Sequence, residues 1–443
     1  MKIKLAAVFF LLWTPVLFAV DLPLADLIIT HARIFDGRDE RLRENSAIVI
    51  IRGKIVAITD AALAPAAKET IDAANRIVIP GLIDAHIHPS IPVAFSTIRD
   101  NDQNYLALRA ATEARNILLR GFTTIRDMGG PSFGLKQAID ESLIEGPRIF
   151  PSGAIISQTS GHGDFRARSS EPRRWSGRND VLERQGYGLI ADGPDEVLTA
   201  VREQLRSGAT QIKLAAGGGI SSMYDPIDTV QYVEAELQAA VHAAADWGTY
   251  VAVHAYTPAA IRRSVEAGVR SIEHAHLIDE TTMKLIAERK VFLSPQAYVF
   301  SGVFEPASPQ IAGAPLSKSA QVSVGLDHMM TLAKRYNVKV AFGTDVFGSA
   351  KVFPWESREF GARLRWFTSL EILRQATSIN AELLALSGPR NPYPEGKLGV
   401  IEVGAWADLL IVEGNPLVDV RVLEDPARNL RLILKGGRIV KRL

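Results

Sequence analysis

Two histidines separated by a single residue close an apolar stretch at residues 80–89, which read PGLIDAHIHP. If this stretch is a β-strand, His86 and His88 point to the same face, because side chains alternate along a strand, and the two imidazoles can share one cation. A His-x-His pair alone is also a common incidental pattern, so the claim depends on further ligands. The pair predicts half of a metal site at a strand end.

Four more titratable residues lie in or at the ends of later apolar runs: Lys213, His254, His274 and Asp345. Each has an ordinary alternative when taken singly. The two histidines could be hydrogen-bonded core residues, and the aspartate could cap the turn that follows it. Together with the first pair, however, these residues supply four imidazoles, an amine and a carboxylate. Such a set of nitrogen and oxygen donors is typical of divalent metal sites.

Lys213 is the unusual member of this set. An ammonium group in an apolar strand beside divalent cations suffers both desolvation and charge repulsion. Burial lowers the pKa of the amine, and the neutral amine can react with carbon dioxide to give a carbamate anion that bridges two metals. The alternative is a lysine whose ammonium reaches solvent or meets a carboxylate. The other candidate ligands favour the carbamate.

These residues need a scaffold that brings distant strand ends together, and the middle of the chain alternates predicted strands with predicted helices. Helical patterns occur at residues 105–119, 196–207, 234–247 and 326–335. The candidate strands number eight and lie at residues 77–86, 122–126, 148–154, 210–214, 250–254, 271–274, 291–294 and 338–342. We therefore expect an α/β fold, a (β/α)8 TIM-type barrel, with its chemistry at the carboxyl ends of the strands. Residues 158–193 are too long for a plain connection and are predicted to form an active-site loop.

Both ends of the chain are rich in short β-strand patterns broken by Gly-containing turns, such as residues 47–51 and 54–58 near the start and 407–412 near the end. We expect the two ends to build one small β-sandwich. The predicted domains are a signal peptide at 1–19, a β-sandwich made of 20–79 plus 396–443, and a barrel at 80–395.

Composition narrows the possible partners and the compartment. The chain has 443 residues and a net charge of +1, without a basic stripe, so nucleic acid is not an expected partner. With no cysteine, disulfides and thiolate ligands are excluded. A charged start, MKIK, followed by apolar residues 5–19 predicts a secretory signal and a periplasmic or secreted protein; an uncleaved anchor is the alternative. We expect no stable membrane span after signal removal, and a homo-oligomer.

Four motifs carry a family resemblance: residues 79–88, 121–127 (GFTTIRD), 396–399 (GKLG) and 407–416 (ADLLIVEGNP). With them the chain resembles the amidohydrolase superfamily of metal-dependent hydrolases, which implies a (β/α)8 barrel with a β-sandwich built from both chain ends. The IKL of residues 212–214 and the GHGD of residues 161–164 are similar to the branch of binuclear dipeptidases and carboxypeptidase-like amidases, to which ochratoxin-hydrolysing amidohydrolases belong. One departure is NAE at 380–382, where the family usually has Asn-Pro-Ala; it affects the start of a helix and not the predicted site.

The resemblance implies a role for each candidate ligand. One metal is held by His86, His88 and Asp345, the other by His254 and His274, and carbamylated Lys213 bridges them. Zinc is the expected ion, although manganese, cobalt or iron suit the same donors. Asp345 is also the expected proton shuttle.

Two loop residues are expected to contact the substrate. His162 would help to polarise the scissile carbonyl, and by resemblance Tyr224 would bind the carboxylate of a C-terminal amino acid. Their alternatives are an exposed loop histidine and a turn tyrosine that packs its ring. His276 is expected to lie behind the metal ligands, and His242 to be structural.

The resulting hypothesis is a binuclear amide hydrolase that takes a small-molecule substrate and releases a C-terminal amino acid from N-acyl amino acids or dipeptides. Ochratoxin A, cleaved to ochratoxin alpha and phenylalanine, would be one such substrate. A cyclic-amide or imidazolone ring hydrolase is one alternative, and a non-catalytic metal-binding scaffold is another.

Overall fold

The fold is that of a computed structural model, which describes residues 24–300 and 314–443. The predicted signal peptide lies outside these residues. Helices of the described chain are α1 (Phe95–Ile98), α2 (Gln103–Leu119), α3 (Phe133–Asp140), α4 (Arg173–Ser176), α5 (Val181–Arg184), α6 (Pro194–Arg206), α7 (Glu234–Asp246), α8 (Pro258–Ala267), α9 (Glu280–Glu288), α10 (Ala314–Ser323), α11 (Leu326–Arg335), α12 (Glu359–Arg363), α13 (Ser369–Arg374), α14 (Asn380–Ala385) and α15 (Pro426–Asn429). Within the described residues, no helix is long and apolar enough to cross a membrane.

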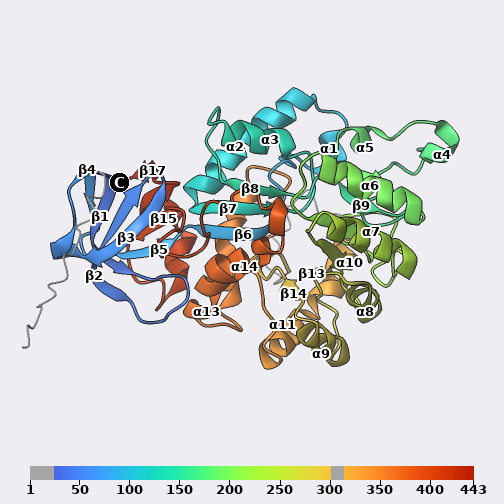
Figure 1. The fold of residues 1–443 in the computed structure, drawn as a ribbon. Coiled ribbons are helices and arrows are strands. Elements are labelled where there is room, and N and C mark those ends of the chain that lie inside the picture. Colours follow the sequence, from blue (N-terminus) through green and yellow to red (C-terminus); the bar gives the residue numbers. More distant parts are fainter. Residues whose placement is uncertain (1–23, 301–313) are drawn as a thin grey trace, which may run out of the picture.

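The two ends of the chain meet in one sheet of eight strands, drawn in blue and red in Figure 1. Its strands are β1 (Ala25–Ile34), β2 (Arg43–Ile51), β3 (Lys54–Asp60), β4 (Ala67–Asp72), β5 (Ile77–Pro80), β15 (Leu409–Val412), β16 (Leu430–Lys435) and β17 (Arg438–Arg442). The ends join where β5 pairs antiparallel with β15, with Ile79 opposite Leu410. Because β5 is followed after one residue by the strand at Leu82–Ile87, this sheet fixes the position at which the first strand of the central part of the chain begins.

The middle of the chain is a mixed α/β fold with parallel strands. They are β6 (Leu82–Ile87), β7 (Phe122–Asp127), β8 (Arg148–Pro151), β9 (Ile155–Ser157), β10 (Gly188–Ile190), β11 (Ile212–Ala215), β12 (Val251–Ala255), β13 (Ser271–His274) and β14 (Phe292–Ser294). They form a three-stranded sheet, β6-β7-β8, and a six-stranded sheet, β10-β9-β11-β12-β13-β14. Figure 1 shows helices α6 to α9 and α11 along the outside of the larger sheet. The alternation of strand and helix patterns in the sequence predicts this arrangement, because parallel strands need crossover connections.

Hydrogen bonds connect the edges of the two parallel sheets. The Ala85 N–H of β6 donates to the Phe342 carbonyl at 2.8 Å, and Val340 forms a parallel bridge with Leu293 of β14. On the other side, the Thr210 N–H, just before the internal strand β11, donates to the carbonyl of Pro151 in β8, an edge strand of the smaller sheet, at 2.8 Å. The strand predicted at residues 338–342 is therefore present as a single bridge rather than as a ladder.

The predicted loop at residues 158–193 contains local structure. It includes α4, α5 and β10, which pairs parallel with β9. The predicted third strand, 148–154, ends early as β8, and β9 begins one residue beyond its predicted end; between them lies Gly153, which has a φ of +73° that favours glycine. A division here lets the chain turn outward into the long segment over the carboxyl ends of the strands.

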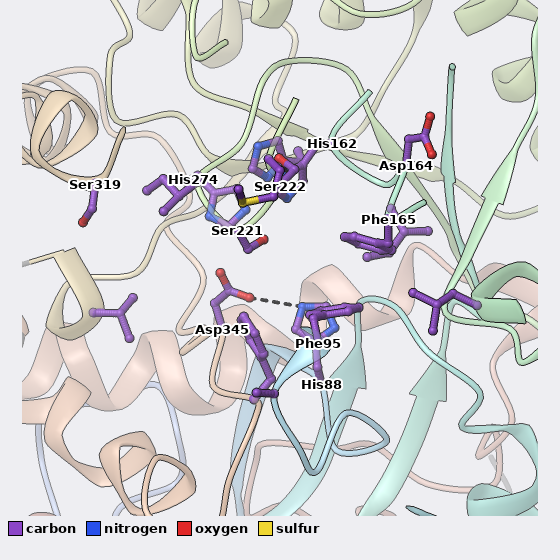
Figure 2. Close-up of a pocket in the computed structure, with 18 of the residues that line it drawn as sticks. His88, Phe95, His162, Asp164, Phe165, Ser221, Ser222, His274, Ser319 and Asp345 are labelled. Atoms are coloured by element: carbon purple, nitrogen blue, oxygen red, sulfur yellow. Dashed lines mark hydrogen bonds and ion pairs between the residues drawn. The ribbon is translucent and has the colours of Figure 1, made fainter. Parts of the chain in front are cut away.

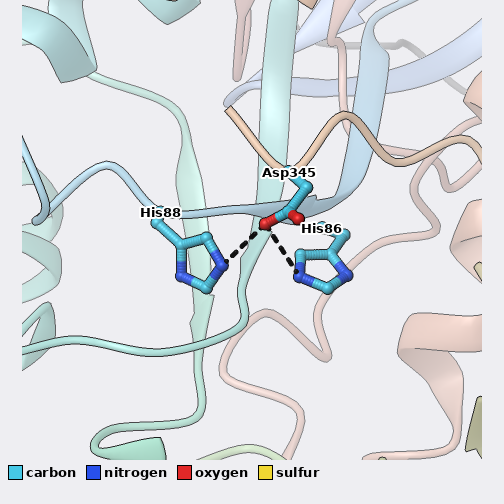
Figure 3. Close-up of side chains that lie close together, drawn as sticks. All are labelled: His86, His88 and Asp345. Carbon is cyan, nitrogen blue, oxygen red and sulfur yellow. Dashed lines mark hydrogen bonds and ion pairs between the residues drawn. The ribbon is translucent and has the colours of Figure 1, made fainter. Parts of the chain in front are cut away.

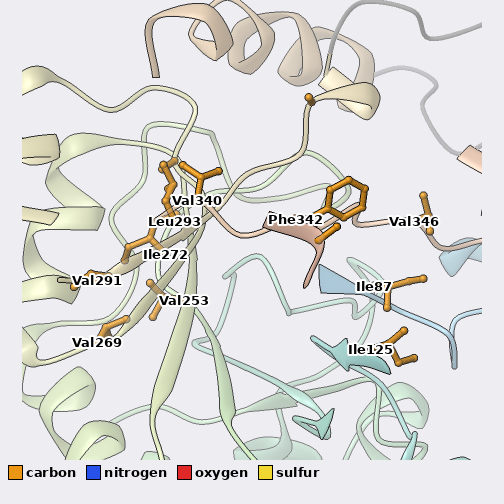
Figure 4. Packing of buried hydrophobic residues seen from close by; sticks show 14 of the residues in the cluster. Ile87, Ile125, Val253, Val269, Ile272, Val291, Leu293, Val340, Phe342 and Val346 are labelled. Atoms are coloured by element: carbon orange, nitrogen blue, oxygen red, sulfur yellow. The ribbon is translucent and has the colours of Figure 1, made fainter. Parts of the chain in front are cut away.

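Local signals explain where the predicted helices begin. The Asp102 side chain accepts hydrogen bonds from the N–H groups of Asn104 and Tyr105 at the start of α2, and Pro194 occupies the first turn of α6. Between strands and helices lies one large buried cluster, part of which Figure 4 shows: Ile87, Ile125, Val253, Ile272, Leu293, Val340 and Phe342. Full burial of each such side chain contributes about 1.5–3 kcal/mol.

Candidate active site

The first predicted ligands lie together at the carboxyl end of β6. One ligand atom each of His86, His88 and Asp345 lies within 4.8 Å of the others, as Figure 3 shows. Asp345 Oδ1 lies 3.1 Å from His88 Nε2 and 3.4 Å from His86 Nε2. The two histidines share a face because they are two residues apart on the strand. Asp345 has a φ of +55°, in the left-handed region, and its N–H donates to the His86 carbonyl at 2.6 Å.

The other predicted ligands surround the same space. Lys213 comes from β11, His254 from β12 and His274 from the end of β13, and all three are buried. The ring centroid of His274 lies 5.1 Å from that of His86 and 4.5 Å from that of His254. All six predicted ligands line one cavity of about 460 Å³, part of which Figure 2 shows.

Each of the four imidazoles has one nitrogen engaged by a protein oxygen. His86 Nδ1 lies 2.8 Å from Glu273 Oε2, and His274 Nδ1 lies 2.5 Å from Gln296 Oε1. The corresponding contacts of the other two are His88 Nδ1 to the Gly129 carbonyl at 2.9 Å and His254 Nε2 to the Gly218 carbonyl at 3.1 Å. Because these oxygens accept, the engaged nitrogen of a neutral ring carries the proton, and the other nitrogen has a lone pair. In His86 and His88 that other nitrogen, Nε2, faces Asp345 Oδ1, at 3.4 and 3.1 Å.

Burial keeps most of these rings neutral. It lowers the pKa of His86 and His254 well below the ordinary value for histidine and that of His274 to about 3. Burial alone would raise the pKa of Asp345, but His86, His88 and His274 hold it well below the usual range, so the carboxylate is ionised. His88 is the exception, because burial alone would lower its pKa but the contact with Asp345 raises it. Three neutral imidazoles beside an anionic carboxylate fit the donor set of a divalent metal site.

Lys213 is buried, and the described part of the chain supplies no partner for its amine. Its amine makes no hydrogen bond or ion pair with any residue in 24–300 or 314–443. Burial lowers its pKa to about 8, against the opposing influence of Glu273 and Asp345. At this pKa about one amine in ten is neutral at pH 7, against roughly one in three thousand at the ordinary lysine pKa. The site therefore contains an amine available for reaction with carbon dioxide.

His162 lies against a predicted ligand rather than in solvent. Its ring stacks on that of His254 with centroids 4.0 Å apart and an interplanar angle of 20°. His162 Nδ1 lies 2.7 Å from the Ser222 hydroxyl, and burial lowers the pKa of the ring to about 4. The ring is thus neutral and held at the edge of the cavity.

Tyr224 also lines the cavity but is 40% exposed. The Arg168 guanidinium lies 5.2 Å from the centroid of the Tyr224 ring. The phenol is thus at the rim, with a cation beside it.

The two remaining histidines singled out in the sequence are not predicted ligands. His276 is fully buried, with Nε2 3.2 Å from the Gln296 carbonyl, and His242 is exposed on α7.

Residues 77–440 match the Amidohydrolase family. This chain belongs to the amidohydrolase family. It is 30% identical over 437 residues to the ochratoxinase of Aspergillus niger, covering 94% of this chain and 86% of that protein. Among solved structures, a prolidase complexed with N-methylphosphonate-L-proline is similar at 35% identity and a TM-score of 0.85, covering 94% of this chain and 100% of that one. A Xaa-Pro dipeptidase with bound methionine in the active site is 30% identical, with a TM-score of 0.81 and coverage of 93% and 99%.

As an amidohydrolase the protein is an enzyme, a hydrolase that acts on amide or peptide bonds. Members of the family generally bind metal ions, and the cluster of His86, His88 and Asp345 is a candidate metal site in this one. The cavity that contains this cluster has the size of a small-molecule site.

A buried ion pair orients His86, the first predicted ligand of this amidohydrolase. Glu273, which contacts His86, is held by the Arg126 guanidinium at 2.8 and 2.9 Å and by the Ser271 hydroxyl at 2.6 Å. Arg126 also donates to the Ala85 carbonyl at 2.5 Å, and neither charged side chain is exposed. Burial alone would raise the pKa of Glu273, but Arg126 lowers it below the usual range. The ionised carboxylate therefore fixes the tautomer and the direction of the His86 ring.

Glu273→Gln is expected to weaken metal binding by about 10–100-fold, because the neutral amide holds His86 less firmly. It should also lower the free energy of unfolding by about 3–5 kcal/mol, since Arg126 is left buried without its counter-charge. Competition with a chelator measures the first effect, and denaturant titration the second. Glu356→Gln is the matched control, because Glu356 is equally buried beside Arg120, at 2.6 Å, but does not line the cavity. Equal metal affinity in the two variants would contradict the assigned role.

A buried lysine holds the loop that carries the partners of His162. Lys318 Nζ of α10 donates to the carbonyls of Gly219, Ser222 and Asp225 at 2.9, 2.8 and 2.7 Å, and lies 3.3 Å from Asp225 Oδ1. The other carboxylate oxygen of Asp225 accepts from the Gly219 N–H at 2.7 Å. This one ammonium therefore fixes the conformation of residues 219–225, and through Ser222 the position of His162.

Lys318→Met is expected to lower kcat/KM by roughly 10–100-fold, because small displacements of groups at a reacting centre have effects of this size. Metal content should be unchanged, since none of the predicted ligands contacts Lys318. Steady-state kinetics and metal analysis on the same preparation measure both. The control is Lys334→Met on α11, where a half-exposed lysine pairs with Glu371 at 3.1 Å and should have little effect. Equal kcat/KM in both variants would show that the lysine does not position the loop.

Several of these groups were missed from the sequence. Glu273 had a visible signal, because a carboxylate within a four-residue buried strand, SIEH, needs a partner. Arg126 carried the same signal within the buried strand FTTIRD. Lys318 and Gln296 had none, since each acts on residues far away in the chain.

Proposed function

We propose that this amidohydrolase is a binuclear metal-dependent enzyme that releases a C-terminal amino acid from N-acyl amino acids or dipeptides. The observation that carries the proposal is the convergence on one cavity of six predicted ligands, which come from β6, β11, β12, β13 and the segment that follows the Val340 bridge. The similar ochratoxinase, prolidase and Xaa-Pro dipeptidase make ochratoxin A and Xaa-Pro dipeptides reasonable members of the substrate set.

In this proposal His86, His88 and Asp345 hold one metal, His254 and His274 hold the other, and a carbamate on Lys213 bridges them. Two divalent ions, Zn²⁺ in our proposal, would lower the pKa of a shared water and polarise the scissile carbonyl when bound. The protein oxygens that engage one nitrogen of each imidazole support this assignment, because they direct the other nitrogen toward the cavity. The Lys213 amine, which has no partner among residues 24–300 and 314–443, supports it as well.

In this proposal three side chains transfer the proton, polarise the carbonyl and bind the substrate carboxylate. Asp345 accepts the proton of the attacking water and passes it to the leaving amine, for which an ionised carboxylate beside His86 and His88 is well placed. His162 has Nδ1 2.7 Å from the Ser222 hydroxyl, and when Ser222 donates to this nitrogen the proton on Nε2 can be donated to the carbonyl oxygen. Tyr224 at the rim donates to the carboxylate of the leaving amino acid.

We also propose that the contacts through Phe342, Val340 and Thr210 complete an eight-stranded barrel over residues 80–395. In this view residues 20–79 and 396–443 form the β-sandwich domain. Export to the periplasm or medium and a homo-oligomeric assembly stay predictions from the sequence.

The test is a substrate panel on one preparation: N-acetyl-L-phenylalanine, ochratoxin A, two Xaa-Pro dipeptides and a cyclic amide, each with and without chelator. We expect release of free amino acid from at least one of the linear amides, abolished by the chelator and restored by Zn²⁺. Ring opening without release of an amino acid would favour the cyclic-amide alternative. Absence of turnover on all of them, with full metal content, would reject the proposed substrate class.

A further inference from the structure

Three phenylalanines line one side of the cavity without taking part in the proposed chemistry. Phe95 and Phe165 stack with centroids 4.3 Å apart, and Phe347 meets Phe95 edge to face at 5.7 Å. Phe347 also lies edge to face against His88, at 5.8 Å. These three rings form an aromatic wall next to the first metal ligands, and Figure 2 shows Phe95 and Phe165 beside His88 and away from Ser319.

The aromatic wall is anchored on its far side and open toward the cavity. Its rings pack against a buried cluster made by Ile91, Ile98, Leu106, Leu182 and Tyr187. Each of the three rings is only partly buried, and each lines the cavity. Apolar ring surface left uncovered in a site gains stability when a ligand removes it from water, and an aromatic ligand gains more through ring contacts.

The two arginines that line the cavity near Phe95 and Phe165 are already paired. Arg99 pairs with Asp180 at 2.8 Å, and Arg166 pairs with Asp164 at 2.6 Å. A charged group placed against the wall would therefore be desolvated without a free counter-charge. The wall fits an uncharged ligand group.

The rim of the cavity, where Tyr224 lies beside Arg168, instead suits a charged ligand group. Arg168 makes no ion pair within residues 24–300 and 314–443, and its guanidinium lies over the Tyr224 ring at 5.2 Å. A phenol and an unpaired cation together suit a carboxylate. A substrate with its carboxylate at Tyr224 and Arg168 then has its other end, the acyl group, available for the aromatic wall.

We propose that Phe95, Phe165 and Phe347 form the acyl-group subsite of this enzyme and select substrates whose acyl group is an uncharged planar aromatic ring. The inference rests on the proposed release of a C-terminal amino acid and adds the chemical class of the other half of the substrate. The aromatic wall determines specificity and has no part in bond cleavage.

The test compares three amides that share L-phenylalanine as the leaving group: N-benzoyl, N-cyclohexanecarbonyl and N-acetyl. The first two differ in planarity at similar size. With the metal-loaded enzyme we expect kcat/KM for the benzoyl amide to exceed that for the cyclohexane amide by about tenfold, the size of a favourable aromatic contact. Phe165→Leu and Phe95→Leu should reduce this ratio toward one while changing kcat/KM for the acetyl amide by less than about threefold.

Phe300→Leu is the matched control. Phe300 is also an aromatic lining residue, but it lies on the side of His276, with ring centroids 4.2 Å apart. The benzoyl-to-cyclohexane ratio should survive this substitution. Metal content and thermal unfolding of every variant show whether a lost preference reflects a damaged site.

A ratio near one in the unmodified enzyme, or a ratio that the two wall variants leave unchanged, would overturn the inference. So would wall variants that alter the preference for the leaving amino acid instead of the acyl group. If none of the three amides is hydrolysed, the proposed function fails on these substrates, and calorimetric binding of the same compounds to the unmodified enzyme decides the inference. Preferential binding of the benzoyl amide, lost in Phe165→Leu, would support it, and equal binding would reject it.

Discussion

Asp345→Asn is expected to lower kcat by about three orders of magnitude, within the range found when a positioned acid or base is removed. Asparagine has nearly the same size as aspartate, so the fold should persist. It cannot accept the proton of the attacking water, however, and it carries no charge to balance a metal beside His86 and His88. Measuring kcat at saturating metal separates the loss of proton transfer from the loss of metal binding.

Asp164→Asn is the control for this substitution. Asp164 lines the same cavity, but its carboxylate is occupied by Arg166, at 2.6 and 2.7 Å. Only a few-fold change in kcat is expected, because this carboxylate takes no part in the proposed proton transfer. If Asp345→Asn with full metal content kept more than about a tenth of kcat, the proton would have to move through another group.

Lys213→Ala is expected to reduce activity by about a thousandfold, since it removes the proposed bridge and with it several kcal/mol of metal-dependent stabilisation. The bound metal should fall from two ions toward one per chain. Intact mass measured under native conditions should show one added carbon dioxide on the unmodified protein and none on the variant. Full activity with two metals in Lys213→Ala would reject the carbamate bridge.

A second buried lysine provides the control. Burial also lowers the pKa of Lys435, in the sheet of the chain ends, to about 8. Its amine, unlike that of Lys213, donates to the Gly146 carbonyl at 2.6 Å. Lys435→Ala should therefore cost stability but leave the metal content and the carbon dioxide adduct unchanged. The comparison distinguishes a reactive amine from a merely buried one.

The elements that position the site were predictable because their signals are local. The helices expected at residues 105–119 and 326–335 are α2, two residues longer at its start, and α11, with the same bounds. Strand ends were readable from runs of apolar residues that stop at a titratable one. The predicted strand at 338–342 is reduced to a bridge, since a ladder depends on the neighbouring strand and no periodicity within the segment encodes that pairing.

For the two loop residues, the sequence indicated candidates but not their environment. His162 and Tyr224 were singled out in the sequence with an alternative for each. Tertiary contacts place His162 against His254 and leave Tyr224 at the rim. In both cases the deciding contact comes from a segment distant in the chain, on which the local pattern carries no information.

The sequence by itself determined the family, the donor types and the faces on which His86 and His88 lie, because motif spacing and the alternation of side chains along a strand are properties of neighbouring residues. Only the tertiary structure decided which charges are paired: Glu273 is neutralised by Arg126, whereas Lys213 has no partner among residues 24–300 and 314–443. It also assembled the aromatic wall from Phe95, Phe165 and Phe347. Pairing and packing depend on distances across the fold, and those distances exist only once the strands have come together.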